Sequence, residues 1–174
     1  TLDEFNHFRI FRYLLKKEKN QIIHSQKVSI NELEKYCGDK KQFQKFIGIA
    51  TSPEYGILIF HQHDEWEGDN LISINIEFID KWQKLKNICY DERVESNLVD
   101  KILNLAQLYN SGKGELLTDE QVIESNILLE SDSFDKFWVG KYSSDFNLIK
   151  GFVIKSKEFR LKIQESNERK RILK

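Results

Sequence analysis

Apolar residues recur at helical spacing near the start of the chain. Between Phe5 and Lys17, one side of the pattern is apolar and the other is basic. Such a pattern predicts an amphipathic helix, which we expect to end near Asn20 before a weakly extended run over residues 21–28. The apolar positions are Phe8, Phe11, Leu14 and Leu15, and the basic positions are Arg9, Arg12 and Lys16.

Two further helices joined by a glycine are expected next. Ser29 and Glu32 have the spacing of a capping box, and Gly38 is typical of the residue that follows a helix end. Asp39 is a suitable cap for a third helix that reaches Ala50. Two short helices around a glycine turn indicate a helix-turn-helix. The positions expected to face inward are Ile30, Leu33 and Cys37 on the first of these helices, and Phe43, Phe46, Ile47 and Ala50 on the second.

A β-hairpin is predicted after these helices. The run from Ile57 to Phe60 is rich in β-forming residues, and the run from Leu71 to Phe78 alternates between apolar and polar positions. The apolar face of the second run consists of Ile72, Ile74, Ile76 and Phe78. In its order of elements, the segment from about residue 5 to 80 resembles the winged-helix superfamily. The resemblance implies an N-terminal winged helix-turn-helix with a β-hairpin wing. Together with the helical patterns that follow, we expect an α+β, mostly α fold with a helical C-terminal half.

The second half of the chain shows mainly helical patterns. Asp80 is expected to cap a helix that runs to Tyr90, and the wholly charged Asp91-Glu92-Arg93 indicates a hinge. We therefore expect a winged-helix-like module over residues 1–90 and either a helical extension or a degenerate second module over residues 91–174.

Three helices are predicted in this half. The first has an apolar face of Val99, Ile102, Leu103, Ala106 and Tyr109, and the second follows Thr118 with Val122, Ile123, Ile127 and Leu128. For residues 146–173 we expect one long helix broken near Gly151. A strand over residues 148–154 followed by a helix is the alternative.

Composition limits the class of protein. The chain is 40% hydrophobic and 12% aromatic, so it has enough apolar surface to fold and is not intrinsically disordered. No apolar run approaches the roughly 20 residues that span a bilayer, and the start lacks the pattern of a secretory signal. We therefore expect a cytoplasmic, intracellular protein that does not bind membranes. Cys37 and Cys89 are too far apart for a metal-binding or redox motif.

Charge is distributed in stripes, although the net charge is only -1. The segment from Arg9 to Lys45 has a surplus of about +6, whereas the segment from Glu54 to Asp80 contains no Lys or Arg and carries about -7. The helix-turn-helix is therefore basic and the expected hairpin is acidic.

The basic segment suggests DNA binding. A recognition helix needs cationic and amide side chains for phosphates and base edges. The expected DNA-binding residues are Lys40, Lys41, Gln44 and Lys45 on the third helix, with Arg9 and Arg12 on the first. We expect a DNA-binding protein, either a regulator of transcription or a replication-type factor. The partner would be double-stranded DNA, and a homodimer remains open.

The acidic hairpin supports an alternative. Carboxylates near a phosphate are repulsive, so an acidic wing suits a basic protein partner better than it suits DNA. In this interpretation the chain is a protein-protein interaction module whose wing provides the contact. The expected protein-binding residues are Asp64, Glu65, Trp66, Glu67 and Asp69.

Catalytic and metal chemistry are weakly indicated. His61 and His63 are the best candidates for metal ligands, because residues two apart on a strand face the same side. Two ligands do not form a zinc site, and no nucleophile and base can be paired from the sequence. We therefore expect no enzyme, no cofactor and no functional metal.

Overall fold

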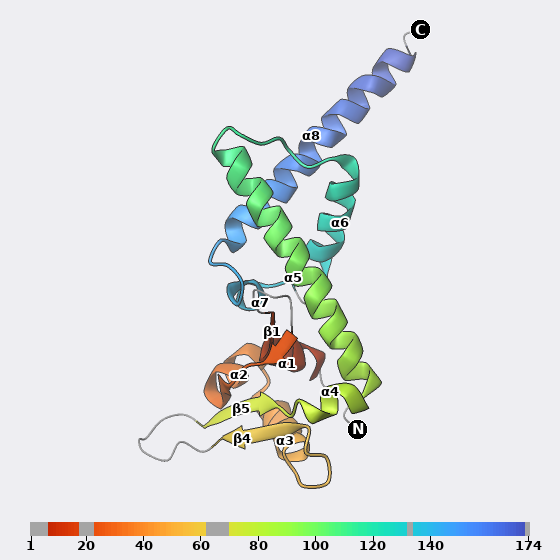
Figure 1. The fold of residues 1–174 in the computed structure, drawn as a ribbon. Helices are drawn as coiled ribbons and strands as arrows, with labels where there is room; N and C mark the ends of the chain where they lie inside the picture. The colour runs from red at the N-terminus through yellow and green to blue at the C-terminus, as the bar shows by residue number, and fades with distance from the viewer. Residues whose placement is uncertain (1–6, 18–22, 62–69, 132–133, 173–174) are drawn as a thin grey trace. The chain divides into compact units, whose positions relative to one another are not determined.

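The computed structural model describes residues 7–17, 23–61, 70–131 and 134–172 of the chain. The described residues are mostly helical and form two small antiparallel sheets, so the expected α+β, mostly α class is confirmed (Figure 1). The chain divides into two compact units, Thr1–Val94 and Glu95–Lys174. Each unit has its own hydrophobic core. None of the described helices is long and apolar enough to cross a membrane.

The first helix of unit 1 is shorter than expected. Helix α1 (His7–Leu14) ends at Leu14, and the chain continues directly into β1 (Leu15–Lys17), which pairs antiparallel with β2 (Ile23–Ser25). The predicted end of this helix near Asn20 was therefore wrong. The side chain of Leu15 is fully buried, and an extended backbone places it in the core while β1 pairs with β2. The side chain of Phe8 lies outside the described part.

The glycine-linked helix pair forms as expected. Strand β3 (Val28–Ser29) leads into α2 (Ile30–Cys37), where the Ser29 hydroxyl accepts from the Glu32 N–H. Gly38 ends α2 in the left-handed region at φ 75°. The Asp39 carboxylate then caps α3 (Lys40–Ala50) by accepting from the Gln42 N–H at 3.0 Å. The two capping residues and the glycine were correctly predicted.

The hairpin consists of β4 (Leu58–His61) and β5 (Leu71–Ile74), which pair antiparallel. With β3 they form a three-stranded sheet in the order β3-β5-β4, of which Figure 1 labels β4 and β5. The second strand ends four residues before the expected Phe78. Asn75 ends it, because its side-chain oxygen accepts from the Glu77 N–H and starts the short helix α4 (Glu77–Lys81). Ile76 is consequently exposed instead of buried.

Helix α5 (Gln83–Asn110) runs without interruption through the charged triplet that had suggested a hinge. The predicted hinge was wrong, because α5 continues through it. The predicted helix cap at Asp80 was also wrong, because Asp80 lies inside α4. Glu92 faces the interior of unit 1 and is paired with Arg12, while Asp91 and Arg93 are exposed. The triplet is thus part of one ordinary helix turn with a single buried acid.

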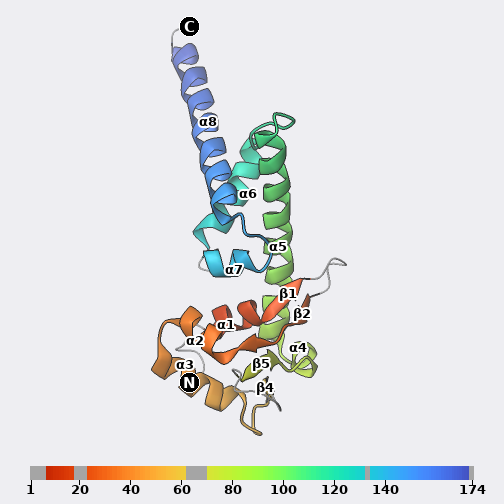
Figure 2. The ribbon, with the colours of Figure 1, turned by 90° about the vertical axis from the view of Figure 1, so that its left-hand side faces the viewer.

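The core of unit 1 contains residues of both its helices and its strands, and Figure 2 shows how these elements lie within the unit. Phe11 of α1 contacts Phe46 of α3 and Trp82 edge-on, with ring centroids 5.8 and 5.6 Å apart. Helix α1 is therefore fixed to α3 and to Trp82, the residue that follows α4, by aromatic packing. The other buried members include Ile10, Leu14, Leu33, Phe43, Ile72, Ile74 and Leu85.

Unit 2 contains the C-terminal part of α5, α6 (Asp119–Glu130), α7 (Lys136–Gly140) and α8 (Phe146–Ile172). Helix α8 is continuous, so the expected break near Gly151 was wrong. Gly151 is exposed, and its neighbours Ile149, Phe152 and Val153 hold the helix in the core. The predicted apolar face of α5 packs into the same core through Val99, Ile102 and Ala106.

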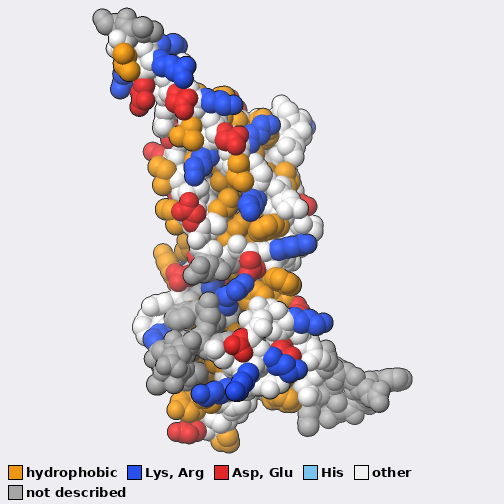
Figure 3. Space-filling model, turned by 180° about the vertical axis from the view of Figure 1, so that it is seen from behind, with side chains coloured by type: hydrophobic (Ala, Val, Ile, Leu, Met, Phe, Trp, Pro, Cys, Tyr) orange, Lys and Arg blue, Asp and Glu red, His pale blue; other side chains and the backbone are white. Residues whose placement is uncertain are grey.

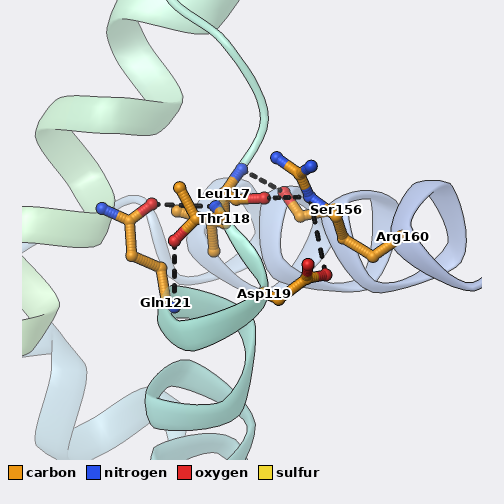
Figure 4. A network of polar contacts seen from close by, with 6 residues as sticks. All are labelled: Leu117, Thr118, Asp119, Gln121, Ser156 and Arg160. Atoms are coloured by element: carbon orange, nitrogen blue, oxygen red, sulfur yellow. Dashed lines mark hydrogen bonds and ion pairs between the residues drawn. The ribbon is translucent and has the colours of Figure 1, made fainter. Parts of the chain in front are cut away.

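A polar network joins the start of α6 to α8 (Figure 4). The buried Ser156 hydroxyl accepts from the Leu117 N–H at 3.2 Å and donates to the Phe152 carbonyl at 2.8 Å. Arg160 Nε donates to the Leu117 carbonyl at 2.7 Å. Thr118 and Gln121 complete the capping box of α6. These bonds fix α6 against one side of α8.

Candidate nucleic-acid interface

Helix α3 presents a polar face to solvent. Phe43, Phe46 and Ala50 are buried, so the opposite side of the helix points outward. The residues on this outer side are exposed and include all four side chains predicted to contact DNA: Lys40, Lys41, Gln44 and Lys45. The prediction that these four share an exposed helix surface is therefore confirmed, while their binding of DNA stays a prediction.

This basic face, defined by those four residues, is only partly neutralised. Lys40 Nζ lies 2.9 Å from the Glu34 carboxylate of α2, and both groups retain contact with solvent. An exposed pair of this kind is weak, so Lys40 can exchange its partner readily. In the view of Figure 3, basic side chains gather with some acidic ones on the lower part of unit 1.

Gly48 extends the same face by one turn. It lies four residues after Gln44, is exposed, and a Cβ placed there would meet no heavy atom within 4 Å. The absence of a side chain lets another molecule approach the backbone of α3 closely at this point.

The two arginines predicted on α1 differ in position. Arg9 is half-buried, with its guanidinium 4.8 Å from the centre of the Tyr36 ring. Arg12 is 6% exposed, and its Nε donates to the fully buried Glu92 at 2.9 Å. The prediction that Arg12 lies on an exposed basic face was wrong, because the buried carboxylate of α5 draws it into the core.

A protein-binding surface was also predicted between β4 and β5. The residues predicted there to bind a protein partner, Asp64, Glu65, Trp66, Glu67 and Asp69, lie outside the described residues, as does His63. On the described part of the hairpin, Ile59 and Phe60 of β4 are exposed.

The His61 side chain contacts another side chain of the same hairpin. Its Nε2 lies 2.8 Å from the Ser73 hydroxyl on the paired strand, and Ser73 is buried. Desolvation, followed by the positive charge of Lys27, lowers the pKa of His61. Across the described ranges, no group of three or more His, Cys, Asp or Glu side chains is placed to hold a metal ion.

The two thiols are poorly suited to chemistry. Burial raises the pKa of Cys37 to about 12, against the opposing effect of Arg9. Burial also raises the pKa of Cys89 to about 11, and Glu92 and Asp80 add to the effect. Since the thiolate is the reactive form, neither residue is an effective nucleophile near neutral pH.

Sequence reasoning missed two polar pairs in unit 1. The Arg12–Glu92 pair joins residues 80 positions apart, and the His61–Ser73 pair depends on the register of β4 against β5. The only sequence signal for the second pair was the hairpin itself. No local signal indicated the first, because both residues sat in charged stretches typical of surfaces.

Comparison with known proteins gives no match for this chain among family models, curated proteins or solved structures.

Proposed function

We propose that unit 1 is a winged-helix module that binds double-stranded DNA through the basic face of α3. The supporting order of elements is α1, β3, α2, α3, β4 and β5, with the three strands in one antiparallel sheet. In this arrangement α2 and α3 are the helix-turn-helix, α3 is the recognition helix and the β4–β5 hairpin is the wing.

The observation that carries the proposal is the exposure of four long polar side chains on one side of a firmly anchored helix. Lys40, Lys41 and Lys45 supply positive charge for phosphates, and Gln44 supplies an amide for a base edge. Anchoring matters because α3 is held by Phe43 and Phe46, so these groups are positioned before DNA arrives.

The acidic wing affects how DNA would be bound. Asp64, Glu65, Glu67 and Asp69 in the sequence between β4 and β5 would repel a nearby phosphate. The proposed complex therefore uses α3 for contact and keeps the wing away from the backbone. Affinity then rests on a few lysines, so we expect modest affinity with a clear dependence on salt.

A titration of fluorescent random duplex DNA, followed by anisotropy at two salt concentrations, tests the proposal. We expect binding at low salt that weakens as salt rises, and a loss of about tenfold or more in affinity for Lys41→Glu. Lys86→Glu is the matched control, since Lys86 is an exposed helix lysine of unit 1 that lies on α5. It should bind like the wild type. No binding to duplex DNA at low salt, or equal losses in both variants, would contradict the proposal.

A second candidate is protein binding through the hairpin. Strand β4 is at the edge of its sheet, and its Ile59 and Phe60 are 39% and 45% exposed. An edge strand with exposed apolar side chains can pair with an extended segment of another protein. The acidic residues that follow β4 in sequence favour a basic partner.

This candidate makes a different prediction. A basic partner recovered by pull-down with the wild type should bind at least tenfold more weakly to Ile59→Ser/Phe60→Ser, while Lys41→Glu leaves it unchanged. If Lys41→Glu abolishes partner binding and the hairpin variant does not, the hairpin is not the contact surface.

A further inference from the structure

Helix α6 has two isoleucines at the centre of its solvent side. Ile123 and Ile127 are 62% and 67% exposed, whereas Val122 and Leu128, the other apolar residues named for this predicted helix, are buried. The side that packs inward consists of Val122, Ser125 and Leu128. Two large apolar side chains one turn apart thus form a ridge that the described residues leave uncovered.

The surroundings of this ridge are acidic. Helix α6 contains four acidic residues and no Lys or Arg: Asp119, Glu120, Glu124 and Glu130, all exposed. Glu124 lies 3.5 Å from Lys101 of α5, in a pair that is exposed on both sides and therefore weak. Asp119 lies 4.0 Å from Arg160 of α8 in the same molecule and is therefore left out of the outer face. The outer face of α6, meaning Ile123, Ile127, Glu120, Glu124 and Glu130, suits an apolar and basic partner.

Helix α8 carries a surface of that kind. Its core-facing residues Ile149, Phe152 and Ser156 are spaced by three and four, and Phe159 and Ile163 continue the same row. The first three are buried, whereas Phe159 and Ile163 are 45% and 38% exposed. The apolar row therefore extends beyond the core of unit 2.

Basic residues accompany the exposed end of this row. From Lys157 to Ile172, α8 has six basic and three acidic residues, and all of them except the half-buried Arg160 are exposed. At helical spacing, Lys170 continues the row itself, and Lys162 and Arg169 flank it. Figure 3 shows basic and apolar side chains exposed along this part of α8, with acidic ones among them. We call Phe159, Ile163, Lys162, Arg169 and Lys170 the α8 extension.

The two surfaces belong to one unit but cannot meet within one molecule. Helix α8 packs against the inner side of α6, and the bonds from Leu117 to Ser156 and Arg160 hold it there (Figure 4). Ile123 and Ile127 point to the opposite side of α6. An α8 extension that covers these two isoleucines must therefore belong to another copy of the chain.

We propose that the chain self-associates through unit 2, with the α8 extension of one copy lying on the outer face of α6 of a second copy. The reverse contact forms in the same complex, so the two contacts close a symmetric dimer rather than an open filament. Apolar burial of the isoleucine ridge stabilises the contact, and opposite charges on α6 and α8 set its orientation. The proposal is independent of DNA binding.

Sedimentation velocity of the full chain without DNA, over a range of protein concentrations, tests this dimer. The wild type should dimerise, and Ile123→Ser/Ile127→Ser should weaken dimerisation at least tenfold. Ile76→Ser is the matched control, because Ile76 is equally exposed at 63% but lies in unit 1. Circular dichroism of the variants checks that they remain folded, as expected for replacements at exposed positions.

A charge exchange provides the second arm. Glu120→Lys/Glu124→Lys and Lys162→Glu/Arg169→Glu should each weaken dimerisation, and the combined variant should recover it because the opposite charges meet again. The proposal is overturned if the wild type stays monomeric up to about 1 mM. It is also overturned if the isoleucine variant dimerises like the wild type, if Ile76→Ser weakens dimerisation equally, or if the combined exchange gives no recovery.

Discussion

Arg12 and Glu92 form the most deeply buried ion pair among the described residues. Their side chains are 8% and 0% exposed, and the Nε of Arg12 lies 2.9 Å from the carboxylate. Moving two charges out of water is costly, and their attraction offsets this cost only while both are present. The pair therefore fixes α1 to α5 within unit 1 without contributing greatly to stability.

Removal of one partner should be far more damaging than removal of both. We expect Glu92→Leu to lower the free energy of unfolding by about 3–5 kcal/mol, because it removes the carboxylate that lies 2.9 Å from the buried Arg12 guanidinium. Arg12→Met/Glu92→Leu should recover most of that loss. Urea unfolding followed by circular dichroism measures both variants. A double variant as unstable as the single variant would show that the buried charge of Arg12 does not cause the loss of stability.

His61 links stability to pH. Because the pKa of His61 is lowered in the folded state, the unfolded chain takes up a proton first as the pH falls through about 6.5, the ordinary value. The stability that neutral His61 contributes is therefore present above that pH and is lost as the pH falls through the lower folded-state pKa. We expect the wild type to lose more stability between pH 7.5 and 5 than His61→Asn does, as measured by urea unfolding. Equal losses would exclude His61 as the cause.

At the scale of single elements, two glycines of the α2–α3 segment have opposite roles. Gly38 ends α2 with φ 75°, a conformation that other residues adopt only with strain. Gly48 lies inside α3 with ordinary helical geometry and with open space around its Cα. Only Gly38 is required by the backbone conformation. Gly48 therefore lowers the stability of α3 without being needed for the geometry of this helix.

The same substitution should therefore have opposite signs at these positions. Gly38→Ala should destabilise unit 1 by about 1–2 kcal/mol, because alanine is strained at positive φ. Gly48→Ala should stabilise it by about 0.5–1 kcal/mol, because alanine favours a helix. Thermal unfolding of the two variants beside the wild type provides the comparison. A stabilising Gly38→Ala would contradict the described end of α2.

Local signals determined which elements could be predicted from the sequence. Ser29, Gly38, Asp39 and Thr118 act on the backbone within four residues, and each ends or begins a helix as expected. The basic face of α3 followed from the same local periodicity.

Features that depend on distant contacts were missed. The end of α1 at Leu14 depends on pairing between β1 and β2, and the continuous α5 depends on the burial of Glu92 beside Arg12. The outward direction of Ile123 and Ile127 follows from the burial of Ser125, whose side of α6 packs inward. Tertiary packing therefore determines which side of α6 faces the core, and hydrophobicity alone does not predict that side.

At the scale of the whole molecule, each of the two units contains one of the proposed contact surfaces. Unit 1 contains the basic face of α3, which supports DNA binding, and unit 2 contains the complementary surfaces of α6 and α8, which support self-association. The two proposals rest on different units, so each can be tested and can fail alone.

The salt dependence of DNA affinity is the most direct test of the central claim that the basic face of α3 contacts phosphates. Each neutralised phosphate contributes about 0.9 to the slope of the logarithm of affinity against the logarithm of salt concentration. Per bound protein chain, Lys41→Ala/Lys45→Ala should therefore reduce the magnitude of the slope by about 2 relative to the wild type and to Lys86→Ala. An unchanged slope in the double variant would contradict the assignment of α3 as the DNA-binding helix.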